Sequence, residues 1–199
     1  MLRCQGPANR TNSPAQAVIL IGFMGAGKSS VGRALAERLG WGFEDLDERI
    51  EQREGKKVFE IFRDSGEAGF RRSEHAALKE LLAELRTSPE KVIALGGGAF
   101  IHESSAALIK SAKIPTTFLD AGAEELWERC RRQSAEQGIE RPLLGSPEGF
   151  RKLYEQRRPH YLKASRRQET GGKTVEQIAA ELIRALRLGE GRGRQGDNE

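Results

Sequence analysis

Short apolar runs alternate along the chain with segments whose apolar residues recur every three or four positions. The runs AVILI (17–21), VIAL (92–95) and TTFLD (116–120) have the length and composition of buried parallel strands. The more mixed run WGFEDLD (41–47) predicts one further strand. Each run ends at an acidic residue or directly before a glycine, so the strands are expected to end at these positions.

Helical spacing fills the stretches between these runs. The segment KSSVGRALAERLG (28–40) places Val31, Leu35 and Leu39 on one face and ends at a glycine. Segments 48–55 and 57–66 predict short helices, and DSGE (64–67) has capping-box spacing at the start of a long helix. Further helices are predicted over 123–132, over 150–164 as far as its proline, and after the cap TVEQ (174–177).

Strands that alternate with helices predict an α/β fold, with a parallel sheet covered by helices on both faces. No repeat or linker divides the chain, so we expect one folded domain over residues 17–188. Residues 1–16 and 189–199 are polar and rich in glycine, proline or asparagine, and are expected to be disordered extensions. Residues 133–149 predict a mobile loop.

Composition narrows the class of protein. The 199 residues carry a net charge of +4, but the arginines are mixed with acids and few aromatic residues accompany them, so nucleic-acid binding is not expected. No run of 18 apolar residues and no secretory signal are found, which predicts a protein without a membrane partner. The two cysteines, Cys4 and Cys130, form no disulfide framework and are interpreted as reduced thiols of a cytoplasmic protein, expected to be a monomer.

The strongest chemical signal is the phosphate-binding loop GFMGAGKS (22–29), which matches G-x-x-x-x-G-K-[ST] and lies between a predicted strand and a predicted helix. Its glycines let backbone N–H groups face phosphate oxygens, Lys28 should reach the β- and γ-phosphates, and the Ser29 hydroxyl should bind Mg²⁺. Asparagine occurs only at positions 9, 12 and 198, so the chain has no N-K-x-D guanine motif. We therefore expect phosphoryl transfer from ATP to a small molecule.

Two acids follow the second predicted strand. In an extended strand Asp45 and Asp47 would share a face at its carboxyl end, where parallel sheets bind ligands. One acid could serve Mg²⁺ through water and the other could accept hydrogen bonds from substrate hydroxyls. A solvated acidic turn that caps ERIEQ (48–52) explains the pair equally well.

Several arginines and a glycine triplet are candidates for an acceptor site. Arg71 and Glu74 share a helical face, and such a fork suits a substrate carboxylate, although a surface ion pair is the alternative. Arg141 lies in the presumed lid and could reach the γ-phosphate on closure. Either Arg157 or Arg158 could form a second carboxylate fork or simply place a cation at a helix end. The triplet Gly96, Gly97 and Gly98 permits close approach to a ligand or forms a plain turn.

Taken together, the motifs resemble those of the shikimate kinase family. The matching segments, in the order of the family, are GFMGAGKSSVGR (22–33), DLDERIE (45–51), FRRSE (70–74), ALGGGA (94–99), RPLL (141–144) and RRPHY (157–161). The resemblance covers residues 17–188. It implies a nucleoside-monophosphate-kinase-like P-loop fold, three layers α/β/α around a five-stranded parallel sheet, with a mobile lid. It also implies ATP- and Mg²⁺-dependent phosphorylation of the 3-hydroxyl of shikimate, in the pathway to chorismate and the aromatic amino acids.

The same resemblance implies roles for single residues. Ser29 would ligate Mg²⁺ and Asp45 would assist through water, while Asp47 would bind the hydroxyls of shikimate. Arg71 and Arg157 would hold its carboxylate, and the glycine triplet would line its site. Lys28, Asp47 and Arg141 would act in catalysis. The nucleotide would contact Gly25, Ala26, Gly27, Lys28, Ser29, Ser30, Arg141 and, at the adenine, Arg132 or its neighbour Arg131.

Two segments depart from the family pattern. The stretch before RPLL is longer than usual, which leaves Arg131 and Arg132 as alternatives at the adenine. SRRQETGGK (165–173), where the fifth strand is expected, has no apolar run. Two other functions stay open, a kinase of another small polyol acid such as gluconate and a catalytically silent nucleotide-binding module.

Overall fold

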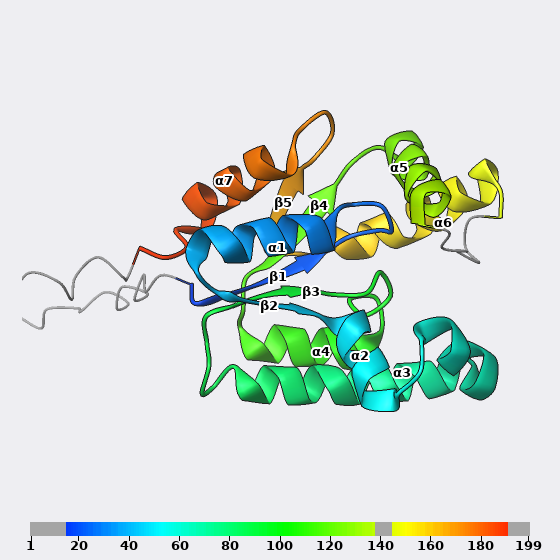
Figure 1. Ribbon diagram of the computed structural model, residues 1–199, viewed down its shortest axis with the longest axis horizontal. Coiled ribbons are helices and arrows are strands. Elements are labelled where there is room, and N and C mark those ends of the chain that lie inside the picture. The colour runs from blue at the N-terminus through cyan, green and yellow to red at the C-terminus, as the bar shows by residue number, and fades with distance from the viewer. Residues whose placement is uncertain (1–14, 138–144, 191–199) are drawn as a thin grey trace, which may run out of the picture.

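A computed structural model describes residues 15–137 and 145–190 of the protein (Figure 1). Five parallel strands form one sheet in the order β2-β3-β1-β4-β5, with α1 and α7 on one face and α3 and α4 on the other. The predicted three-layer α/β/α fold with a five-stranded parallel sheet is confirmed. The strands are β1 (Ala17–Ile21), β2 (Gly42–Asp45), β3 (Lys91–Ala94), β4 (Thr116–Asp120) and β5 (Arg166–Glu169). The helices are α1 (Lys28–Leu39), α2 (Leu46–Glu54), α3 (Val58–Glu84), α4 (Glu103–Ala112), α5 (Ala123–Gln137), α6 (Pro147–Tyr161) and α7 (Val175–Leu186).

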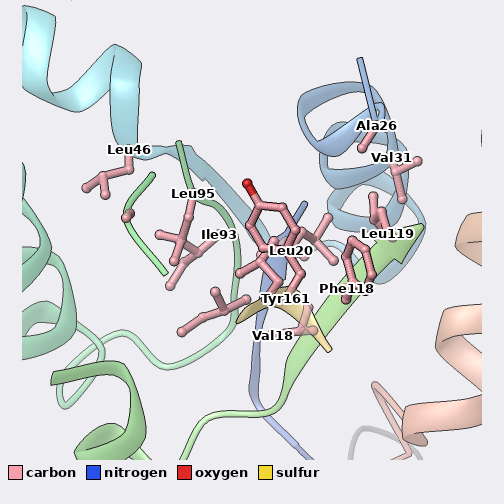
Figure 2. Packing of buried hydrophobic residues seen from close by; sticks show 14 of the residues in the cluster. Val18, Leu20, Ala26, Val31, Leu46, Ile93, Leu95, Phe118, Leu119 and Tyr161 are labelled. Carbon is pink, nitrogen blue, oxygen red and sulfur yellow. The ribbon is translucent and has the colours of Figure 1, made fainter. Parts of the chain in front are cut away.

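The core forms around the central strands. Every residue of β1 and β4 is buried, because both strands have neighbours on either side and helices over both faces. Figure 2 shows the side chains of Val18, Leu20, Ile93 and Phe118 gathered with the ring of Tyr161, which comes from the end of α6. The end of α6 is thereby fixed to the sheet.

The fifth strand has no apolar run because it lies at the edge of the sheet. β5 pairs with β4 alone, and Gln168 is its one buried residue. Its amide donates to Glu181 of α7 at 2.6 Å, so a polar side chain is satisfied where an apolar one was expected. An apolar pattern is therefore absent from this strand although its ladder is regular.

The second strand is shorter than predicted. β2 ends at Asp45, whose side chain accepts from the backbone N–H of Asp47 at 3.0 Å and caps α2. Asp47 therefore lies in the first turn of a helix and not beside Asp45 on a strand face, so the predicted shared strand face is wrong. The long α3 contains the two predicted helical segments, which meet at a kink where Gly66 adopts φ 65° and ψ −176°.

The helices around the predicted loop are longer than expected. α5 continues to Gln137 and α6 begins at Pro147 behind a Ser146 cap, so residues 133–149 are not all loop. α6 also continues through Pro159 to Tyr161, whereas the sequence predicted an end at the proline. Proline removes one backbone hydrogen bond. Burial of Phe150, Tyr154 and Tyr161 on the same helix offsets this cost.

Three parts of the sequence-based description fall outside the described residues. They are residues 1–14, 138–144 and 191–199, so the predicted disordered extensions and the central part of the predicted lid stay predictions. The fold is ordered from at least Gln16, whose carbonyl accepts from Lys91 at 3.2 Å. Within the described ranges no helix is long and apolar enough to cross a membrane.

Candidate active site

The motif residues meet at the carboxyl ends of β1, β2 and β3. These strands are neighbours in the sheet, so the loops that follow them lie side by side. They carry the phosphate-binding loop, the two acids and the glycine triplet in turn. This edge is where parallel α/β sheets bind ligands.

The lysine of the phosphate-binding loop donates hydrogen bonds to carbonyl groups at the start of the same loop. Lys28 Nζ donates to the carbonyls of Gly22 and Phe23 at 3.0 and 2.9 Å. Gly27 precedes α1 in a left-handed conformation without a side-chain cap, and the first backbone N–H groups of the helix face the same loop. Of the other predicted nucleotide contacts, Ala26 is buried, Gly25 adopts φ 78°, and Ser30 is exposed in the first turn of α1. The arrangement provides an anion site that contains one ammonium group.

Ser29 and Asp45 form an oxygen pair beside that anion site. The Ser29 hydroxyl donates to Asp45 Oδ2 at 2.6 Å, while Asp45 Oδ1 accepts from the N–H of Asp47. Among the described residues no group of three or more His, Cys, Asp or Glu could hold a metal ion. One hydroxyl and one carboxylate fit Mg²⁺ nevertheless, because Mg²⁺ keeps much of its water and takes oxygens from phosphates.

Asp47 lies opposite the glycine triplet. A Cβ atom built on Gly96 would come within 2.5 Å of Asp47 Oδ1, so the carboxylate is in close contact with this backbone. Burial, and then the negative charge of Asp45, raise the pKa of Asp47 to about 6, although Lys28 opposes the shift. A carboxylate with such a pKa is suited to orient a hydroxyl and to accept its proton near neutral pH.

Arg71 and Glu74 form a buried pair rather than a surface one. Arg71 Nη1 donates to both Glu74 oxygens at 3.1 and 2.9 Å, and the Glu74 side chain is 1% exposed. Burial raises the pKa of Glu74 more than Arg71 lowers it. A Cβ on Gly98 would come within 2.6 Å of both Arg71 Nη atoms, so the guanidinium lies directly against the triplet.

The arginines of α6 divide between two places. Arg157 Nη1 would be 3.6 Å from a Cβ on Gly97, and its guanidinium lies 5.8 Å from the centre of the Phe23 ring in the phosphate-binding loop. Arg158 instead donates to Asp120 at 2.9 Å. The structure therefore separates the two alternatives, because Arg157 alone of this pair is at the triplet.

The structure adds residues that sequence reasoning left without a role. The Tyr161 hydroxyl donates to the carbonyl of Gly97 and also lies against Arg157. Burial raises the pKa of Tyr161 to about 12, so the phenol stays protonated and remains a donor. No periodicity signals this contact, since it joins segments that are 64 positions apart. Asp120 was detectable, because it is an acid at the end of an apolar strand, as Asp45 is.

The predicted nucleotide contacts of Arg131, Arg132 and Arg141 stay predictions, although α5 itself lies against the phosphate-binding loop at Gly25. Arg131 and Arg132 are both exposed on α5, where they line a hollow of about 550 Å³ with Trp127. This does not decide between them at the adenine. Arg141 lies outside the described residues.

Comparison with known proteins now decides the family. A sequence profile described as shikimate kinase matches residues 24–187. The chain belongs to the shikimate kinase family. A shikimate kinase of Thermus thermophilus is 41% identical over 185 residues, which cover 90% of this chain and 95% of that protein.

Solved structures agree with the family. The shikimate kinase of Acinetobacter baumannii in complex with shikimate superposes with a TM-score of 0.75 at 33% identity, over 87% of this chain and 92% of that one. A gluconokinase of Sinorhizobium meliloti, at 20% identity and a TM-score of 0.55 over 88% of this chain and 94% of that one, shares the fold alone. Membership of the shikimate kinase family makes the protein an ATP-dependent small-molecule kinase, and the gluconate alternative is not favoured.

Proposed function

We propose that this member of the shikimate kinase family transfers the γ-phosphoryl group of ATP to the 3-hydroxyl of shikimate. The product, shikimate 3-phosphate, leads to chorismate and the aromatic amino acids. The observation that carries the proposal is the convergence of Arg71 and Arg157 on the glycine triplet across from Asp47. Two cations that flank a carboxylate base suit an acceptor that bears both a carboxylate and hydroxyl groups.

The donor side of the reaction rests on alignment and charge. Residues 25–30 would hold the phosphates with their backbone N–H groups, and Lys28 would leave the carbonyls of Gly22 and Phe23 for the β- and γ-phosphates. Ser29, with Asp45 through water, would hold Mg²⁺, which supplies positive charge to the phosphates. Phosphoryl transfer passes through a loose transition state, so this alignment matters more than a strong base.

The acceptor side rests on orientation. Arg71, held by Glu74, and Arg157, held by Tyr161, would bind the carboxylate of shikimate. Gly96, Gly97 and Gly98 would let the ring approach the backbone. Asp47 would then accept a hydrogen bond from the 3-hydroxyl and receive its proton as the new O–P bond forms.

The remaining roles belong to the same proposal. Arg141 would contact ATP from the lid and Arg132 would contact adenine. The domain would extend over residues 17–188, with a lid near 133–149, and would act as a monomer in the cytoplasm. Neither nucleic acid nor membrane is proposed as a partner.

The function is tested by measuring ADP release with ATP, Mg²⁺ and a panel of shikimate, quinate and gluconate. We expect turnover with shikimate, slower or no turnover with quinate, and none with gluconate. Activity with gluconate alone would contradict the proposal. Failure of all three acceptors, with ATP still bound, would instead support the silent nucleotide-binding module.

A substitution in the glycine triplet tests the acceptor site. Gly98→Ala should raise the KM for shikimate at least about tenfold, because its Cβ would displace the Arg71 guanidinium, from which it would lie 2.6 Å away. The KM for ATP should change less than twofold. Gly42→Ala, at the amino end of β2 and outside the proposed site, is the matched control, because its Cβ meets atoms no closer than 3.7 Å. An equal rise in both KM values for Gly98→Ala would indicate general disruption instead.

A further inference from the structure

The two adjacent arginines of α6 point to different partners. Successive residues of an α-helix are separated by about 100° around its axis. Arg157 accordingly reaches the glycine triplet while Arg158 reaches Asp120 at the end of β4. A rotation of α6 by about 100° would bring Arg158 to the place of Arg157 and turn Arg157 away from the triplet. The structure must therefore contain something that fixes this rotation.

Asp120 is a buried carboxylate that accepts hydrogen bonds from three side chains on two segments. Its side chain is 4% exposed. Oδ1 accepts from the Tyr154 hydroxyl at 2.9 Å, and Oδ2 accepts from Arg158 Nη2 at 2.9 Å and from Arg167 Nε at 2.8 Å. Tyr154 and Arg158 belong to α6, and Arg167 belongs to β5. A buried carboxylate that loses a donor is strongly destabilised, so these directions are enforced.

On the α6 side the contacts close into a triangle. Arg158 Nε donates to the Tyr154 hydroxyl at 3.1 Å while its Nη2 donates to Asp120, and the Tyr154 hydroxyl itself donates to Asp120. Tyr154 and Arg158 are four positions apart and lie on one face of the helix. Two directional contacts from one face to a single fixed carboxylate define the angle of the helix about its axis.

The apolar contacts of α6 are less selective. Phe150 and Tyr154 pack edge-on against Phe23 at centroid distances of 5.0 and 5.6 Å. Such burial stabilises the helix against the phosphate-binding loop, but it is largely non-directional. The directional contacts of α6 are the hydrogen bonds to Asp120 and the one from Tyr161 to Gly97, and those to Asp120 are the ones that hold Arg158 itself.

We propose that Asp120 is a positioning residue that fixes the rotation of α6 through Arg158 and Tyr154, and so selects Arg157 as the arginine that faces the acceptor carboxylate. The inference rests on the proposed function, in which Arg157 binds that carboxylate. Asp120 does not contact substrate. Asp120 acts on acceptor binding through α6. Loss of its contacts with this helix should therefore change the KM for shikimate and not the KM for ATP.

The test compares Arg158→Gln with Arg167→Gln. Both variants remove one positive charge and one hydrogen bond to the same oxygen of Asp120, but only Arg158 lies on α6. We expect Arg158→Gln to raise the KM for shikimate at least about fivefold, with kcat and the KM for ATP within about twofold of wild type. Arg167→Gln should leave all three within about twofold. Equal changes in the two variants, or an unchanged KM for shikimate in Arg158→Gln, would overturn the inference.

Two further variants test the inference if Arg158→Gln does not fold, and test the role of Arg157 separately. Tyr154→Phe keeps the aromatic packing but removes the hydroxyl, so it opens the same triangle and should raise the KM for shikimate if Arg158→Gln does not fold. Arg157→Ala tests the premise separately. An unchanged KM for shikimate in Arg157→Ala would refute the role of Arg157, whereas a rise there without a rise in Arg158→Gln or Tyr154→Phe would refute only the positioning by Asp120.

Discussion

Asp47→Asn should abolish phosphorylation of shikimate while ATP still binds and the apoprotein becomes more stable near neutral pH. The asparagine keeps the size of the side chain and its place in the first turn of α2 but cannot accept a proton. A loss of kcat of at least about 100-fold is expected, in line with removal of a general base. ATP affinity, measured by calorimetry, should change less than about threefold.

The expected gain in stability follows from the sign of the pKa shift. The pKa of Asp47 is raised from 3.8 to about 6 in the folded protein, so the charged carboxylate is disfavoured by folding. Below pH 3.8 the group is neutral in both states and no penalty exists, whereas above pH 6 the penalty is complete. At about 1.4 kcal/mol per pKa unit it amounts to about 1–3 kcal/mol, which Asp47→Asn removes.

Urea unfolding at two pH values measures this effect. The excess stability of Asp47→Asn over wild type should be largest at pH 8 and about half as large at pH 5, where folded Asp47 is mostly protonated. Glu37→Gln, on the exposed surface of α1, is a carboxylate control that should leave kcat unchanged. Near-normal turnover of Asp47→Asn would remove Asp47 from the mechanism. If turnover is lost but Asp47→Asn shows no pH-dependent gain in the free energy of unfolding, Asp47 keeps its role in catalysis and only the penalty for burying its charge is refuted.

Lys28→Met should lower kcat/KM for ATP at least about 100-fold and should also shift the pH dependence of the residual activity. Loss of the ammonium group removes positive charge where the transferred phosphoryl group develops negative charge. Lys28 also lowers the pKa of Asp47, so its removal should raise that pKa above about 6. The acidic limb of the rate profile should therefore move to higher pH.

A charge-retaining variant separates the two effects of Lys28. Lys28→Arg keeps a cation near Asp47, so its acidic limb should stay close to that of wild type even though the bulkier guanidinium binds phosphate less well. The measurement is kcat/KM for ATP between pH 5 and pH 8 in each variant. If the acidic limb of Lys28→Met lies at the same pH as those of Lys28→Arg and wild type, the electrostatic link between Lys28 and Asp47 is absent.

The sequence predicted the fold because its signals are local and mutually consistent. The apolar runs at 17–21 and 116–120 became β1 and β4 without a change of bounds, since both strands are buried on both faces. The TVEQ cap was equally local, and Thr174 and Gln177 form the expected capping box of α7. Helix α4 was not predicted, because Ser105 and Ile109 are its only buried residues and leave a weak apolar pattern.

The sequence identified candidate residues for the site better than it predicted their arrangement. Asp45 and Asp47 were both identified, but on one strand face, whereas the structure puts the chain into α2 directly after Asp45. The two acids have different contacts. One oxygen of Asp45 accepts the helix-capping hydrogen bond and the other accepts from Ser29, whereas the carboxylate of Asp47 faces Gly96. The observed strand of four residues and the predicted one of seven differ little in sequence, so this boundary depended on tertiary contacts.

By itself the sequence determined the α/β class, the phosphate-binding loop and the set of polar residues at the carboxyl edge of the sheet, because strand–glycine–helix patterns and short motifs depend on neighbours along the chain. Only the tertiary structure decided that Arg157 faces Gly97 while Arg158 is held by Asp120. The two residues are adjacent and identical in type, so no local signal separates them. The difference is made by a carboxylate 38 positions away, which the packing of α6 on β4 brings into hydrogen-bonding distance.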